Sequence, residues 1–147
     1  MKKIIWILSC LIILIAIYFL TNYIRPNKID IEQTGLIYTN DATYMKKTTI
    51  KIQGDLYKSL FSRNTFIGEL ILDGDLKHDI KLYQEDNRYF GLLTSIDDEY
   101  RAVETIGSVS LSINFDRTWI QSDEINLRYD LYEGYISSPA NTIDEAK

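Results

Sequence analysis

The chain has 147 residues, a formal net charge of −5 at pH 7 and a single cysteine, Cys10. All 21 acidic residues follow the first 24 positions, whereas of the 16 basic residues only Lys2 and Lys3 precede position 25. An acidic domain of this kind lacks the phosphate-neutralising surface of a nucleic-acid-binding protein. A domain without cysteine also excludes a disulfide framework and a thiolate metal site.

An uncharged apolar run, Ile4–Leu20, stands near the start of the chain between basic residues. A membrane helix takes about 20 mostly apolar residues, and Thr21–Ile24 extend the run to that length. Trp6 near one end and Tyr23 near the other are spaced like aromatic residues at lipid headgroup depth. We therefore expect residues 1–24 to form a single N-terminal transmembrane signal anchor, embedded in the membrane lipid bilayer through the apolar run, rather than a core helix of a globular protein.

Two cleaved alternatives compete with the anchor. The segment Ile7–Cys10 resembles the lipobox of bacterial lipoproteins, but the longest apolar stretch follows Cys10, so cleavage there would leave a mature chain that begins inside the hydrocarbon. A cleaved secretory signal ends in small residues, whereas Tyr18–Leu20 are bulky. We therefore expect Cys10 to lie in the membrane as a small apolar residue, and its lipidation stays open.

The basic residues near the ends of the run indicate its orientation. Two lysines and the α-amino group precede the run, whereas Arg25 and Lys28 after it are soon offset by Asp30 and Glu32. We expect a single-pass protein of the cell membrane, with a cytoplasmic N-terminus and an extracytoplasmic domain. The acidic domain is expected to stand off an anionic bilayer surface.

Beyond the anchor, we expect a tether over 25–33, a β domain over 34–138 and a C-terminal tail over 139–147, in which 142–147 begin a helix. Alternating hydrophobicity and turn residues about every ten positions indicate short strands, and Asp73-Gly74 is a hairpin signal. No segment provides the helical crossovers of a parallel sheet. The sequence therefore predicts an all-β antiparallel sandwich or barrel of about 8–10 short strands, at 35–39, 48–53, 66–72, 77–83, 88–94, 100–105, 109–114, 118–121, 125–132 and 135–137.

Catalytic and metal-binding signals are weak. His78 is the only histidine, but the adjacent Asp79 would point to the opposite face of a strand, so we interpret His78 as a surface residue beside a hairpin. Asp73-Gly74-Asp75 fits a turn better than a calcium loop, because the residues that follow lack the ligands and the glycine that an EF-hand loop needs at its later positions. The phosphate-binding and nucleophile motifs are absent. We expect no cofactor, no metal and no catalytic residue.

Tyrosine is the more informative residue type. Tyr129, Tyr132 and Tyr135 bracket two carboxylates near the end of the domain. Exposed tyrosine beside carboxylates is typical of surfaces that stack on sugars or bind proteins. Cross-strand packing is the alternative explanation. We predict these three residues as a possible contact for a partner or ligand.

Three functional hypotheses follow for this single-pass bacterial membrane protein. The first is a non-catalytic binding or assembly module at the outer face of the cytoplasmic membrane, with a protein partner. The second is a lipocalin-like or glycan-binding barrel for a small ligand, which would need an apolar cavity or a stacking surface. The third is a carboxylate-based hydrolase, which would need a cleft with facing acids and raised pKa values.

Overall fold

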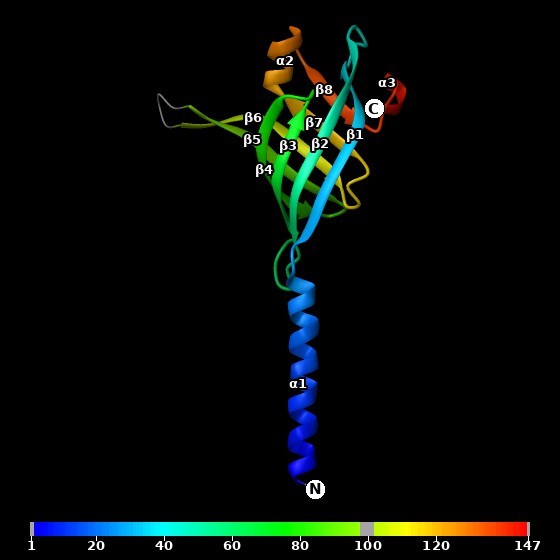
Figure 1. Ribbon diagram of the computed structural model, residues 1–147. Coiled ribbons are helices and arrows are strands. Elements are labelled where there is room, and N and C mark those ends of the chain that lie inside the picture. Colours follow the sequence, from blue (N-terminus) through cyan, green and yellow to red (C-terminus); the bar gives the residue numbers. More distant parts are fainter. Residues whose placement is uncertain (1, 98–101, 147) are drawn as a thin grey trace.

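The computed structural model describes residues 2–97 and 102–146. The described residues form one long helix, α1 (Lys2–Ile24), then eight strands and two short helices (Figure 1). The strands are β1 (Asn27–Thr39), β2 (Met45–Tyr57), β3 (Thr65–Leu72), β4 (Leu76–Glu85), β5 (Arg88–Asp97), β6 (Ala102–Ser112), β7 (Thr118–Ser122) and β8 (Gly134–Ser138). The short helices are α2 (Asp123–Tyr129) and α3 (Ile143–Ala146), the latter within the expected helix start.

Each strand pairs antiparallel with the next one in the chain, and β8 pairs with β1, so the sheet closes into a barrel. The predicted all-β antiparallel architecture is confirmed, and of the two expected closures the barrel is the one that forms. The turn between β3 and β4 shows why neighbours pair. Asp73 and Gly74 have φ values of 53° and 88°, in the left-handed region that the predicted hairpin turn requires.

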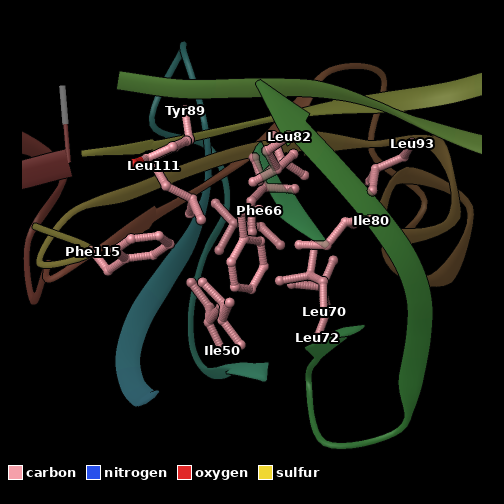
Figure 2. Packing of buried hydrophobic residues seen from close by; sticks show 14 of the residues in the cluster. Ile50, Phe66, Leu70, Leu72, Ile80, Leu82, Tyr89, Leu93, Leu111 and Phe115 are labelled. Carbon is pink, nitrogen blue, oxygen red and sulfur yellow. The ribbon is translucent and has the colours of Figure 1, made fainter. Parts of the chain in front are cut away.

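Side chains of alternate strand positions fill the barrel interior. In β4, the buried Ile80 and Leu82 alternate with exposed neighbours. Phe66 is fully buried, and its ring centroid lies 5.4 Å from that of Phe115 (Figure 2). An eight-stranded barrel is just wide enough to be filled by its own side chains. Other members of this core include Ile50, Leu70, Leu72, Tyr89, Leu93 and Leu111.

The expected strand over 125–132 is wrong, because most of this segment belongs to α2. Asp123 and Glu124 occupy the first helical turn, where carboxylates complement the helix dipole. Asp130 ends the helix with a φ of 53°. Ile125 is fully buried and contributes to the barrel core. The alternation of apolar and polar residues here reflects a short amphipathic helix.

Two further boundaries differ from expectation. β1 begins at Asn27, so residues 27–33, expected in the tether, pair with β2 as part of the barrel wall. The strands expected at 100–105 and 109–114 merge into a single strand, β6, which ends before the turn at 113–114. Residues 100 and 101 lie outside the described residues. Ile106 has no partner where the register between β5 and β6 shifts. A β-bulge of this kind lets a strand continue through a break in its alternation.

The helix α1 projects from one end of the barrel (Figure 1). Its described large apolar side chains are exposed, from Trp6 at 74% to Ile24 at 48%. Where α1 ends, the Nζ atom of Lys58 lies 5.9 Å from the ring centroid of Tyr23, so the loop between β2 and β3 lies beside it. Within the described residues, no helix combines the length and the apolar character needed to cross a membrane. The membrane span expected for residues 1–24 stays a prediction.

Candidate functional site

The strand pairing between β4 and β5 stops close to their turn. β4 stays paired with β3 as far as Leu76, and β5 stays paired with β6 as far as Asp97. We call the two facing segments, 76–82 of β4 and 91–97 of β5, the seam. Between β4 and β5 themselves, the described residues pair only next to the turn, at Tyr83–Phe90, Gln84–Tyr89 and Glu85–Arg88.

Backbone groups that have no strand partner among the described residues point toward the seam from both sides. Backbone groups of residues two apart in a strand point to the same side. Glu85 and Arg88 close a two-residue turn, so the N–H and C=O groups of Asp79 in β4 point toward β5. Those of Leu92 and Thr94 in β5 point toward β4 for the same reason. The strand pairing of the described residues gives these groups no partner.

A groove of about 650 Å³ lies on the outer surface at the seam. Gly54 of β2 and Gly68 of β3 stand opposite each other in its floor. A Cβ atom on Gly54 would lie 2.3 Å from the carbonyl oxygen of Ile67, so the two strands come this close only without side chains there. The remaining lining residues are Gln53, Asp55, Ile67, Glu69, Asp79, Ile80, Lys81, Leu92 and Thr94.

The groove is acidic with an apolar side. Asp55, Glu69 and Asp79 contribute three carboxylates, against the single ammonium group of Lys81. Leu92 is 52% exposed on the β5 side. The arrangement offers backbone donors and acceptors, an apolar contact and negative charge along one line. An extended polypeptide with apolar and basic side chains matches all three features.

The three predicted tyrosines lie in three different settings. Tyr129 ends α2, and its hydroxyl donates a hydrogen bond to Asp73. Tyr132 is fully exposed in the loop between α2 and β8. Tyr135 lies on β8, where its ring stacks on Trp119 with centroids 5.3 Å apart. The structure therefore does not bring them together, because the strand that would have aligned them is a helix followed by a loop.

Asp73 is the centre of a polar cluster at the β3–β4 turn. Its carboxylate accepts hydrogen bonds from Lys46 Nζ at 3.0 Å, from Thr48 Oγ1 at 3.0 Å and from the Tyr129 hydroxyl. Burial acts to raise the pKa of Asp73, but these hydrogen bonds hold it below its ordinary value. The hydrogen bond with Tyr129 likewise contributes to a raised pKa of Lys46. The cluster therefore holds a fixed ion pair that orders the turn.

The prediction of a surface histidine is wrong. His78 is 8% exposed, because it takes an inward position of β4. Its Nε2 atom lies 3.6 Å from Glu124 Oε2, beyond hydrogen-bonding distance, and has no hydrogen-bond partner among the described residues. Asp79 is exposed on the opposite face. Among the described residues, no three His, Cys, Asp or Glu side chains gather closely enough to hold a metal ion.

Three aromatic rings from β1, β7 and β8 pack together on the barrel wall. Tyr135 lies between Trp119 and Tyr38, whose ring centroid is 5.9 Å away. The Tyr38 hydroxyl donates a hydrogen bond of 3.1 Å to the carbonyl of Ala146 in α3. A hollow of about 290 Å³ beside these rings is also lined by Asn40 and Gln121.

The seam itself was not predicted from the sequence. Strands were expected at 77–83 and 88–94, but alternation shows which face of a strand is buried and not where its pairing stops. The adjacent Leu92 and Leu93 give the one local indication, because a strand with only one buried face leaves one of them exposed. Comparison of the chain with protein-family models, with curated proteins and with solved structures finds no match.

Proposed function

We propose that this chain is a membrane-anchored, non-catalytic binding module that takes up an extended strand of a partner protein in the seam. The observation that carries the proposal is the pair of facing strand edges, at Asp79 of β4 and Leu92 of β5, which lack a strand partner among the described residues. Proteins usually cover or blunt such edges. An added strand satisfies the free backbone groups and gives affinity through main-chain hydrogen bonds.

The residues that line the groove indicate which side chains the partner strand should carry. Leu92 favours an apolar residue opposite it, and the three carboxylates favour lysine or arginine at the neighbouring outward positions. Electrostatic attraction of this kind raises the rate of encounter and sets the register more than it adds affinity. The partner segment is therefore extended and carries both apolar and basic side chains.

The exposed surface of α1 supports the membrane anchor. The described apolar side chains along the helix have no cover from the barrel. In the sequence, Ile4, Ile5 and Leu8 belong to the same apolar run. The 23 residues of α1 rise about 35 Å at 1.5 Å each, which compares with roughly 30 Å of bilayer hydrocarbon.

Two features weigh against the other hypotheses. The core cluster fills the barrel interior, whereas a lipocalin-like calyx is hollow. A glycoside hydrolase needs a carboxylic acid with a raised pKa. Among the described carboxyl groups, those whose pKa clearly departs from its ordinary value are Asp41, Asp73 and Asp75, and in each case hydrogen bonds lower the pKa.

Hydrogen exchange and peptide binding test the seam on the full chain in lipid nanodiscs. The amides of Asp79 and Leu92 should exchange fast, while that of the neighbouring Ile80 is protected. The probe is the synthetic peptide Lys-Val-Thr-Val-Lys-Val-Thr-Val, and its alternately N-methylated form is the matched control. Binding should protect both seam amides, and N-methylation should abolish it. Equal binding of the two peptides, or protected seam amides in the free protein at every concentration, would refute strand addition.

A cysteine label tests the topology. In a Cys10→Ser background, Asn27→Cys places one thiol just after α1. A membrane-impermeant maleimide should label it from outside intact cells, and the protein should remain in the membrane fraction after alkaline extraction. Release into the soluble fraction contradicts the anchor, and protection from the label reverses the topology.

The stacked rings favour a second candidate function, contact with a glycan. Trp119 and Tyr135 present partly exposed faces beside the polar Gln121, a combination that stacks on sugar rings and hydrogen-bonds hydroxyls. Soluble cell-wall glycan fragments should quench the fluorescence of Trp119 in a Trp6→Phe background. Unchanged fluorescence at saturating glycan removes this candidate and leaves the seam proposal intact.

A further inference from the structure

The loop between β2 and β3, residues 58–64, presents apolar side chains at the end of the barrel that carries α1. We call it the proximal loop. Phe61 is 98% exposed and Leu60 is 48% exposed. The basic residues Lys58 and Arg63 flank this pair. The Nζ atom of Lys58 lies over the ring of Tyr23, near the last turn of α1, and Figure 1 shows the loop beside the helix end.

Internal hydrogen bonds hold the proximal loop in one shape. Ser59 Oγ accepts hydrogen bonds from the backbone N–H of Ser62 at 3.1 Å and from that of Phe61 at 3.4 Å. Asn64 Oδ1 accepts from the N–H of Ser59 at 2.9 Å, and the Asn64 amide donates to Gln84 Oε1 at 2.7 Å. The exposure of Phe61 therefore belongs to an ordered loop that is joined to β4.

We infer that the proximal loop inserts Leu60 and Phe61 into the lipid headgroup region and forms a second membrane contact of this domain. The inference rests on the proposed membrane insertion of α1. If α1 lies in the bilayer, Tyr23 is at headgroup depth, and a loop whose Lys58 contacts that ring is at the same depth. Aromatic and leucine side chains are the ones that partition into this zone.

The charges around the loop fit a lipid surface better than a protein groove. Lys58 extends beside the apolar pair, where a long basic side chain can reach lipid phosphates. Arg63 is held by Glu85 at 3.0 Å, so its charge is largely offset. Apolar insertion is therefore the main contribution, and anionic lipid adds to it through Lys58. The acidic domain as a whole stands off the bilayer, whereas this one loop makes contact.

Depth-dependent fluorescence quenching tests the inference with the full chain in vesicles of phosphatidylcholine and phosphatidylglycerol. A nitrobenzoxadiazole label is placed at Leu60→Cys in a Cys10→Ser background, which keeps Phe61. The matched control is the same label at Tyr132→Cys, on the fully exposed loop after α2. A third sample carries the label on the native Cys10 and reports on α1.

The expected result is strong quenching at position 60 by lipids with a shallow nitroxide, none at position 132, and quenching at Cys10 by lipids with a deep nitroxide. Phe61→Glu should remove most of the quenching at position 60, whereas Phe61→Tyr should retain it. Quenching at Cys10 without quenching at position 60 overturns the inference and leaves the anchor standing. Absence of quenching at all three positions overturns the anchor and the loop contact together.

Discussion

The substitution Asp73→Asn tests how much the negative charge of Asp73 stabilises the fold, because it leaves the shape of the polar cluster nearly unchanged. Asp73 has a φ of 53°, and its side chain is 12% exposed. Asparagine has nearly the same volume and tolerates this left-handed backbone conformation at least as well as aspartate. The substitution therefore keeps the turn and removes the negative charge that Lys46 and the Tyr129 hydroxyl face.

The expected loss of stability depends on which partners of Asp73 can form other hydrogen bonds after the substitution. Hydrogen bonds to a charged group contribute about 1.5–3 kcal/mol each. Thr48 can still donate to the amide oxygen, and the Lys46 side chain, 39% exposed, can turn to water. One charged interaction is lost without replacement, so the free energy of unfolding should fall by about 2 kcal/mol. For a domain of this size, the unfolding midpoint should drop by roughly 6–10 °C.

The measurement is urea unfolding of the full chain in mild detergent, followed by the fluorescence of Trp119 in a Trp6→Phe background. Asp130→Asn is the matched control, because Asp130 also has a φ of 53° but is exposed. It should change the free energy of unfolding by less than about 0.5 kcal/mol. Equal effects of the two substitutions would refute the reasoning, since the loss would then arise from the turn and not from the charge.

The pH dependence provides an independent check on the same pair of proteins. The pKa of Asp73 is lower in the folded chain than its ordinary value. Its contribution is therefore fully present above the unfolded pKa of about 3.9 and is lost as the pH falls through the folded pKa. The stability difference between the natural chain and Asp73→Asn should be constant from neutral pH to about pH 5 and should shrink below about pH 4. A difference that grows toward low pH contradicts the assignment.

Four further substitutions test the fold by urea unfolding. Phe66→Ala should cost about 3–5 kcal/mol because it empties the centre of the core, whereas Phe61→Ala should cost less than about 0.5 kcal/mol. Gly74→Ala should cost about 1 kcal/mol, because a φ of 88° disfavours any Cβ although the space around it is open. His78→Leu should leave stability unchanged or raise it by about 1 kcal/mol, since it removes a buried nitrogen without a partner; a large loss would reveal a hidden partner for that nitrogen.

Sequence alone was sufficient for the antiparallel sheet because alternation and turn chemistry act locally. The pair Ile80 and Leu82 identifies a strand face, and Asp73-Gly74 identifies a hairpin, without reference to the rest of the chain. A series of such hairpins without crossovers leaves an antiparallel sheet as the only pairing. The choice of barrel over sandwich depends on β8 meeting β1, a contact between residues about 100 positions apart. No local pattern encodes that contact.

The candidate site could not be predicted for a related reason. The seam lies where β5 leaves β4 and stays paired with β6, which depends on contacts between strands and not on a pattern within either strand. The three tyrosines lie apart because a run of apolar and polar residues fits a short helix as well as a strand. Asp123 and Glu124 in the first turn of α2 were the available signal for the helix.

The seam and the proposed anchor have a fixed relation in the fold. The polar hollow at the end of α1 is lined by Tyr23, by the proximal loop and by Asp86 of the β4–β5 turn. β4 and β5 are therefore joined at the end of the barrel that carries α1, and they diverge away from it. With α1 and the proximal loop both in the bilayer, the wide end of the seam faces away from the membrane. The proposed partner strand would then enter from that side, run toward the bilayer along β4, and meet the carboxylates of the groove before the closed end.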